Sequence, residues 1–217
     1  GDDSFTYTVS DGTATATGAV SVTVTAVNDA PTAAAGSIAT NEDTAGTLDL
    51  TTLSSDVDKD TLTYTVTDPT NGTVALSEDG IVTYTPSDNY NGDDSFTYTV
   101  SDGTATATGA VSVTVTAVND APTASAGSIT TTEDTAGTLD LSTLSSDVDG
   151  DTLTFTVTDP SNGTVTLSDG VVTYTPTSDY NGDDSFTYTV GDGTETATGA
   201  VSVTVTAVND APTASAG

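Results

Sequence analysis

The sequence repeats itself with a period of about ninety residues, and this repeat limits the possible folds more than any other feature. The segment AVNDAP occurs three times, and its asparagines Asn28, Asn119 and Asn209 lie 91 and 90 residues apart. A repeat of this length is a whole small domain and not one turn of a solenoid. Each AVNDAP segment therefore marks a junction between domains, where proline fixes its own φ and donates no hydrogen bond to a sheet.

This period predicts the domain organisation. We expect complete repeats at residues 31–121 and 122–211, with residues 212–217 as the start of a following repeat. Residues 1–30 are identical to residues 92–121, so we expect them to be the C-terminal fragment of a preceding repeat. Because this fragment has strands without the rest of their domain, we expect it to be the least settled part and prone to strand exchange.

Within each repeat, apolar residues alternate with threonine or serine at a period of two. Leu62, Tyr64 and Val66 point one way and the threonines between them the other, which is typical of strands with one buried face. Segments rich in Asp, Asn, Gly and Pro separate the strands. About seven short strands without helical periodicity predict an all-β fold of tandem seven-stranded Greek-key β-sandwiches. The first repeat has candidate strands at 47–50, 61–67, 73–76, 81–85, 95–101 and 110–116.

The charge balance excludes several classes of function. The chain has 32 acidic residues against one Lys or Arg, a formal charge of −31. Nucleic acid and anionic membranes are therefore not expected partners, because both are bound through basic clusters. Cys and His are absent, which excludes disulfides, Cys- or His-based zinc sites and imidazole catalysis. No apolar run is long enough for a membrane helix, so we expect no membrane insertion.

The acidic residues cluster at the predicted strand ends. Two carboxylates about 4 Å apart repel by about 4 kcal/mol at an effective dielectric near 20, so clustered acids need a metal, protonation or distance. Strand ends gather at the poles of a sandwich, where such oxygens suit calcium. The alternative is that each Asp only caps a turn. The motifs are Glu42-Asp43, Asp56-Val57-Asp58-Lys59-Asp60, Asp93-Asp94 and Asp102 in the first repeat, and Glu133-Asp134, Asp147-Val148-Asp149-Gly150-Asp151, Asp183-Asp184 and Asp192 in the second.

An EF-hand does not explain the Asp-x-Asp-x-Asp run. The twelfth position counted from Asp147 is Thr158, where a bidentate Glu is required, and the sixth is Thr152 instead of Gly. Ligands from separate segments would therefore be needed.

The order of a Glu, a DxD run before a strand, an acidic pair leading into FTYTVSDG, and then VTVTAVNDAP resembles the cadherin repeat and its bacterial cadherin-like relatives in giant RTX-type surface adhesins. The resemblance implies cadherin/Ig-like sandwiches joined by short calcium-binding linkers. It also implies that calcium is held by ligands from both neighbouring domains and from the linker. Ala117 and Ala121 stand where the family has further ligands, so we expect two or three ions at each junction.

Carried over residue by residue, the resemblance implies a ligand set at each junction. The central junction would use Glu42, Asp93, Asp94, Asn119, Asp120, Asp147, Asp149 and Asp192, with Asp43 and Asp151 beside them. The first junction would use Asn28, Asp29, Asp2, Asp3, Asp56, Asp58 and Asp102. The last would use Asn209, Asp210, Glu133, Asp183 and Asp184.

We expect these repeats to be calcium-rigidified extenders of a large bacterial cell-surface adhesin that hold a distal binding domain away from the cell. Their partners would be neighbouring repeats, with strand exchange or end-to-end self-association possible. The alternative is a direct adhesion module, binding like repeats or a glycan, although no groove is evident in the sequence. An enzyme is not expected. Weaker alternatives are a glycosidase built on a carboxylate pair, ice binding by the Thr-x-Thr rows, and a purely halophilic acidic surface.

Overall fold

A computed structural model describes residues 1–212, which contain β-strands and two short 3-10 turns but no α-helix. The chain divides into two compact units, Gly1–Ala117 and Val118–Gly217. No helix of the described residues is long and apolar enough to cross a membrane. The predicted start of a following repeat falls almost wholly on residues 213–217, which lie outside the described part of the chain.

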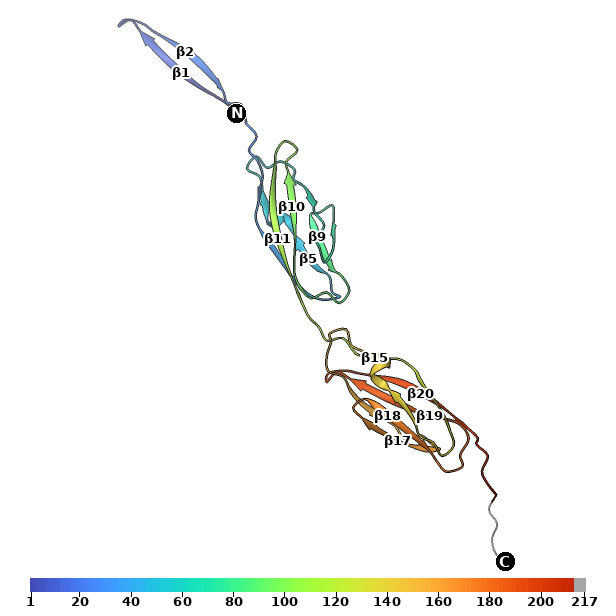
Figure 1. Cartoon of the computed structure of the whole chain (residues 1–217). Helices are drawn as coiled ribbons and strands as arrows, with labels where there is room; N and C mark the ends of the chain where they lie inside the picture. Colours follow the sequence, from blue (N-terminus) through green and yellow to red (C-terminus); the bar gives the residue numbers. More distant parts are fainter. Residues whose placement is uncertain (213–217) are drawn as a thin grey trace, which may run out of the picture. The chain divides into compact units, whose positions relative to one another are not determined.

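The first unit contains a β-sandwich (Figure 1). Its larger sheet has the order β4-β11-β10-β7 and its smaller sheet the order β5-β9-β8. All pairs are antiparallel except β4 with β11, which run parallel. The elements are β3 Thr32–Ala33, β4 Gly36–Asn41, β5 Gly46–Asp49, η1 Leu50–Thr52, β6 Ser54–Ser55, β7 Thr63–Val66, β8 Gly72–Leu76, β9 Ile81–Pro86, β10 Gly92–Ser101 and β11 Thr106–Thr116.

The second unit repeats this topology, with sheets β13-β20-β19-β16 and β14-β18-β17. A four-stranded and a three-stranded sheet in each sandwich confirm the prediction of seven-stranded sandwiches. The elements are β12 Thr123–Ala124, β13 Gly127–Thr132, β14 Gly137–Asp140, η2 Leu141–Leu144, β15 Ser145–Ser146, β16 Thr154–Val157, β17 Gly163–Ser168, β18 Val171–Pro176, β19 Gly182–Gly191 and β20 Thr196–Thr206.

Alternation of side chains along the strands produces the core. Phe96, Tyr98 and Val100 of β10 are 3%, 0% and 0% exposed, while the threonines between them point to the other face. The Tyr98 ring lies over Gly109, its partner on β11, where an added Cβ would come within 2.4 Å of the ring. The Tyr98 hydroxyl donates to the Ala34 carbonyl at 2.8 Å, so its polar end is satisfied.

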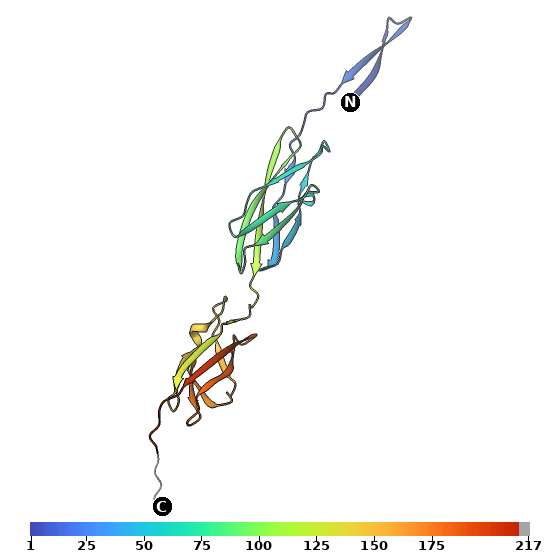
Figure 2. The ribbon, with the colours of Figure 1, turned by 90° about the vertical axis from the view of Figure 1, so that its right-hand side faces the viewer.

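A two-stranded hairpin, β1 (Asp2–Ser10) and β2 (Thr15–Thr23), precedes the first sandwich in the chain. Figure 2 shows it as a twisted ribbon, the form expected of an isolated strand pair. Its register repeats that of β10 and β11, with Tyr7 opposite Gly18 as Tyr98 is opposite Gly109.

Strand β4 and the short β3–β6 pair have no counterpart among the predicted strands. The β4 sequence GSIATN contains one large apolar residue, Ile38, which is too few for an alternating pattern to stand out. Its strand conformation is supported by parallel pairing with β11, a contact between segments more than seventy residues apart.

Candidate metal centre

The end of each sandwich where the preceding linker enters is called here the entry pole. In the first unit it comprises residues 28–29, 56–60 and 102. The Asn28 side-chain amide donates to Asp102 Oδ2 at 3.0 Å and to the Asp29 carbonyl at 3.1 Å. The Asp29 N–H donates to Asp58 Oδ2 at 2.8 Å. The linker is thus bound to two acidic loops of the sandwich that follows it.

The second unit has the same arrangement at residues 119–120, 147–151 and 192. The Asn119 amide donates to Asp192 Oδ2 at 3.0 Å and to the Asp120 carbonyl at 3.2 Å. The Asp120 N–H donates to Asp149 Oδ2 at 2.8 Å. The structure therefore places Asn119, Asp120, Asp149 and Asp192 together within one unit, as it does their counterparts in the first.

The Asp-x-Asp-x-Asp loop lies at the centre of each entry pole. Asp56, Asp58 and Asp60 each present an oxygen, and these oxygens lie within 4.8 Å of one another. Asp147, Asp149 and Asp151 do the same in the second unit. The third carboxylate of each set, Asp60 or Asp151, was not among the principal ligands predicted from the sequence; its place in the DxDxD spacing is the signal that identifies it.

The first carboxylate of each loop has one oxygen satisfied and one not. The Asp60 N–H donates to Asp56 Oδ1 at 3.2 Å, and the Asp151 N–H donates to Asp147 Oδ1 at 3.1 Å. The other oxygens, Asp56 Oδ2 and Asp147 Oδ2, are buried and accept no hydrogen bond from the described residues. A carboxylate oxygen removed from water without a partner costs free energy, and a bound cation would remove that cost.

The donor set fits calcium. The ligand atoms grouped in these loops are carboxylate oxygens, and calcium binds six to eight oxygens at about 2.3 to 2.6 Å in an adaptable geometry. Zinc sites built on Cys or His are excluded, because the chain contains neither. Asp56, Asp58 and Asp60 would hold an ion in the first unit, and Asp147, Asp149 and Asp151 in the second.

Each entry pole contains one further aspartate, Asp102 in the first and Asp192 in the second, whose ionised form is stabilised by hydrogen bonds. The N–H of Ala105, the Asn28 amide and the N–H of Thr104 lower the pKa of Asp102. At Asp192 the Asn119 amide is the largest cause of a lowered pKa, followed by the N–H groups of Glu195 and Thr194. Both carboxylates therefore contribute negative charge to the pole at neutral pH.

The opposite end of the second sandwich, its exit pole, comprises residues 133–134, 179–181 and 208–210. Glu133 is only 6% exposed, and its carboxylate accepts hydrogen bonds from the Val208 N–H and from the Asn181 amide at 3.3 Å. Asp134, Asp179 and Asp210 present oxygens within 4.8 Å of one another. Predicted residues Glu133 and Asp210 thus lie at this pole, whereas Asp179 was missed because it stands alone in a turn.

The first sandwich has a related exit pole at residues 42–43 and 89–91. Glu42 is 3% exposed and its Oε2 accepts from the Asn91 amide at 3.4 Å. Asp43 Oδ1 accepts from the Asn89 N–H at 3.0 Å. The ligand set that the sequence assigns to the central junction draws on both units and stays a prediction.

Asp94 and Asp184 accept hydrogen bonds within their own sandwiches, and the junction role predicted for them stays a prediction. Asp94 accepts from the N–H groups of Asn71 at 2.8 Å, Ser95 at 2.8 Å and Thr70 at 3.2 Å, and from the Tyr84 hydroxyl at 3.0 Å. Asp184 repeats this pattern. Because these bonds use both oxygens, we leave the two residues out of the proposed ligand sets.

These bonds also set the protonation of Asp94 and Asp184. Burial alone would raise the pKa of Asp94, but the N–H groups of Asn71, Ser95 and Thr70 and the Tyr84 hydroxyl together leave it lowered. The pKa of Asp184 is lowered in the same way. Desolvation and the adjacent Asp94 raise the pKa of the Tyr84 hydroxyl, which therefore stays protonated and donates.

The remaining predicted residues are placed as follows. Asp93 and Asp183 accept from Thr114 and Thr204 hydroxyls at 3.3 Å. The Asn209 amide donates to the Asp210 carbonyl at 3.1 Å. Asp2 and Asp3 lie on β1, where Asp3 accepts from the Ser4 N–H at 2.7 Å. The roles of Asp2 and Asp3 in a junction stay predictions.

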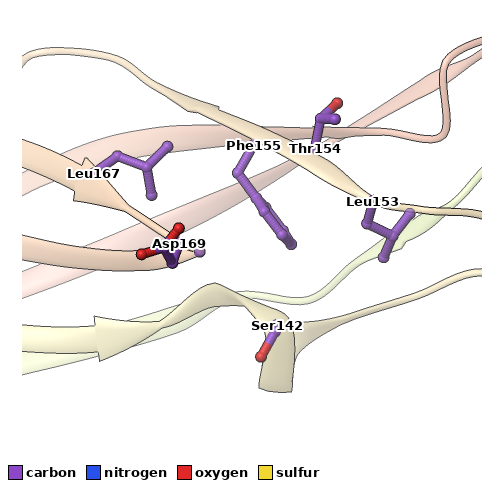
Figure 3. Close-up of a pocket in the computed structure, with 7 residues that line it drawn as sticks. Ser142, Leu153, Thr154, Phe155, Leu167 and Asp169 are labelled. Carbon is purple, nitrogen blue, oxygen red and sulfur yellow. The ribbon is translucent and has the colours of Figure 1, made fainter.

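The second sandwich has an open groove, which was not predicted from the sequence. It has a volume of about 430 Å³. Figure 3 shows the Phe155 ring projecting into the space between Leu153 and Leu167, with Asp169 and Ser142 beside it. The first sandwich has a groove of about 370 Å³ lined by the corresponding Tyr64.

These features define a class of protein: tandem all-β sandwiches whose acidic poles are bound to the linkers between them. The family model "Bacterial Ig domain" matches residues 28–114 and 119–204. The chain therefore belongs to the bacterial Ig domain family, as two tandem copies.

A solved structure of a cadherin supports the fold. Human protocadherin-24 EC1-2 in its form II crystal is 18% identical, with 84% of this chain and 100% of that chain covered and a TM-score of 0.53. The endo-fucoidan hydrolase MfFcnA4 from glycoside hydrolase family 107 is 24% identical over 96% of this chain and 34% of its own, with a TM-score of 0.38. The chain thus spans about a third of that enzyme's length. A search of curated proteins found no match.

Proposed function

We propose that these domains are calcium-binding spacer repeats of a large bacterial surface adhesin, and that calcium fixes each linker to the entry pole of the sandwich that follows it. The observation that carries the proposal is one buried oxygen of Asp56 and one of Asp147 that accept no hydrogen bond from residues 1–212, each beside two more carboxylates. The same arrangement occurs in both units, which an accidental cluster would not explain.

The charge balance supports a metal instead of internal ion pairs. Against 32 acids the chain has one basic residue, Lys59, which lies in the first entry pole, and the second entry pole has no basic residue. Without metal, like charges in the Asp-x-Asp-x-Asp loop repel one another and the linker bound to them. With metal, the same groups become a shared cage that restricts the linker. A stiff linker is what an extended spacer needs.

The near-identity of the repeats supports a spacer role. Residues 1–30 and 92–121 are identical, and the entry poles differ only at the position of Lys59 and Gly150 within the DxDxD loop. A spacer requires length and stiffness, not a unique surface. Bacterial Ig domains in tandem are typical of secreted or surface proteins, which supports an extracellular location. We propose no catalytic role.

Calcium titration of the full chain tests the proposal. We expect calcium to raise the melting temperature, since one site adds about 2.7 kcal/mol at a free ion concentration 100 times Kd. Magnesium should not replace it, because magnesium demands compact octahedral geometry. Asp56→Asn with Asp147→Asn should remove most of the gain, as measured by calorimetry with calcium and with chelator.

Asp68→Asn with Asp159→Asn is the matched control. It makes the same change of charge at exposed turn residues that belong to none of the acidic groups found in residues 1–212. The control should keep the full response to calcium. Equal melting temperatures with calcium and chelator, or an equal loss in both double variants, would contradict the calcium site.

A second candidate function is direct adhesion through the groove beside Phe155. An aromatic ring flanked by Asp169 and Ser142 combines a stacking surface with hydrogen-bonding groups, a combination that suits a glycan. Phe155→Ala should then abolish binding to immobilised glycans while leaving the response to calcium unchanged. Absence of glycan binding by the parent chain would remove this candidate.

A further inference from the structure

The two Asp-x-Asp-x-Asp loops have the same backbone arrangement but a different charge. Lys59 and Gly150 occupy the position between the last two aspartates, and both have positive φ, 65° and 78°. In each loop the N–H of the third aspartate donates to Oδ1 of the first, at 3.2 Å and 3.1 Å. The first entry pole has five aspartates and one lysine, a formal charge of −4, whereas the second has five aspartates, a formal charge of −5.

The charge of Lys59 stays close to the carboxylates of its loop. Lys59 is flanked directly by Asp58 and Asp60, and consecutive Cα atoms are only about 3.8 Å apart. The ammonium group therefore cannot lie farther from these carboxylates than the side chains themselves reach. Lys59 is exposed, so its charge acts on the loop through water. Asp58 is also the residue that accepts the linker N–H of Asp29, at 2.8 Å.

We propose that the residue at this position tunes the calcium affinity of its entry pole, and that Lys59 lowers this affinity in the first sandwich. The inference rests on the calcium-binding function proposed above. A lysine charge repels a divalent cation, whereas glycine has no charge to do so. The linker of the first sandwich would therefore need more calcium to stiffen than it would with glycine at position 59.

Coulomb's law gives the expected size of the effect. A unit charge about 8 Å from a divalent cation, at the dielectric constant of water, changes the affinity for that cation by about fivefold. The Debye length is about 30 Å at 0.01 M ionic strength and about 3 Å at 1 M. The effect should thus be about fivefold at low ionic strength and below about twofold at high ionic strength.

The test titrates the full chain with calcium and follows hydrogen exchange in each loop separately. Peptides that contain residues 56–60 and 147–151 differ in sequence, so mass spectrometry distinguishes them. The midpoint of calcium-dependent protection reports the affinity of each pole. Each variant is compared with the parent in the same loop, and the unaltered loop of the same molecule is the internal control.

Two variants of Lys59 separate charge from backbone conformation. Lys59→Gln removes the charge but keeps a Cβ at positive φ, and we expect the midpoint of the first loop to fall by about fivefold at low ionic strength. Lys59→Arg keeps the charge and should leave the midpoint unchanged. The second loop should keep its midpoint in both variants.

Two variants of Gly150 test the reciprocal change. Gly150→Lys adds the charge to the second loop and should raise its midpoint by about fivefold at low ionic strength. Gly150→Gln adds a side chain without charge. Its midpoint should stay within about twofold of the parent, because backbone strain that is present with and without calcium does not alter the affinity.

The outcomes distinguish this inference from the function on which it rests. Absence of any calcium response in both loops would overturn the calcium-binding function and this inference together. A calcium response with the same midpoint in Lys59→Gln and the parent would overturn only the role of Lys59. Equal shifts in Gly150→Lys and Gly150→Gln, or a shift that is undiminished at high ionic strength, would also overturn it, because charge would not be the cause.

Discussion

The two sandwiches share a fold and an acidic entry pole but differ in the hydrogen bonds of one interior serine, Ser54 in the first and Ser145 in the second. In the first, the Tyr64 hydroxyl and Ser54 Oγ lie 2.8 Å apart and share a hydrogen bond. In the second, Phe155 replaces the tyrosine, and Ser145 Oγ is buried with no hydrogen-bond partner among residues 1–212. The second repeat has lost the hydrogen bond between the aromatic residue and the serine. Both repeats keep the three carboxylates of the Asp-x-Asp-x-Asp loop.

A second difference lies inside the entry poles. Lys59 and Gly150 occupy the same position of the Asp-x-Asp-x-Asp loop, and both have positive φ, 65° and 78°. Glycine adopts this conformation without strain, whereas a side chain with a Cβ does not. Lys59 is also the only basic residue of the chain. The first loop therefore contains both backbone strain and a positive charge that the second lacks.

The largest expected effect tests what the two sandwiches share. Asp94→Asn and Asp184→Asn each place an amide where a carboxylate accepts three N–H groups and a tyrosine hydroxyl. We expect a loss of about 2 kcal/mol of unfolding free energy in each sandwich, because hydrogen bonds to charged groups are the stronger ones. Hydrogen exchange of β9 and β18 peptides, which differ in sequence, would measure each sandwich separately. A loss of unfolding free energy in only one sandwich would show that Asp94 and Asp184 do not have equivalent roles.

The same contact predicts the response to acid. The folded-state pKa of Asp94 and of Asp184 is lowered, so their stabilisation is present above the unfolded carboxyl pKa of about 3.9. It is lost as pH falls through the lower folded pKa. We expect unfolding free energy, measured in urea, to fall below about pH 4 and to fall less steeply in Asp94→Asn. Identical slopes for variant and parent would contradict this assignment.

The interior hydrogen bond predicts opposite effects in the two sandwiches. Phe155→Tyr should stabilise the second by about 1 kcal/mol, because Ser145 Oγ gains a partner, and Tyr64→Phe should destabilise the first by a similar amount. Thermal unfolding with chelator measures both. As a control, Phe155→Tyr combined with Ser145→Ala should show no gain from the hydroxyl. If both variants changed the unfolding free energy in the same direction, the hydrogen bond between the hydroxyl and the serine would not be the cause.

The smallest effect concerns the loop backbone. Lys59→Gly should stabilise the first sandwich by about 0.5 kcal/mol without metal, since relief of strain at positive φ outweighs the greater freedom of glycine when unfolded. Gly150→Lys should act in the opposite direction in the second. Denaturation in chelator measures both variants. Destabilisation by Lys59→Gly would show that the lysine side chain contributes more than its backbone costs.

The fold was largely predictable because its signal is local. The alternation of Phe96, Tyr98 and Val100 with threonines identifies a strand with one buried face wherever it occurs. Strand β4 was not predicted, since a single Ile38 in six residues shows no period. Its pairing depends on β11, far along the chain.

The candidate site was predictable only in part. The acidic loops at residues 56–60 and 147–151 were identified from their spacing, and the structure groups their carboxylates. Asp94 was assigned to the junction because the Asp93-Asp94 pair resembles the acidic pair of the cadherin repeat. Its use inside the sandwich depends on Asn71 and Tyr84, which the turn and the facing sheet bring to it.

The sequence by itself determined the period, the strands, the charge and the residues available to a cation, because each follows from composition or from neighbours a few positions apart. Only the tertiary structure decided which carboxylates are already used and which remain available, because hydrogen-bond partners are set by long-range register. The two identical hairpins show the limit directly: Tyr7 is 55% exposed and Tyr98 is 0% exposed. Burial depends on what packs against a segment, and the segment's own residues do not contain that information.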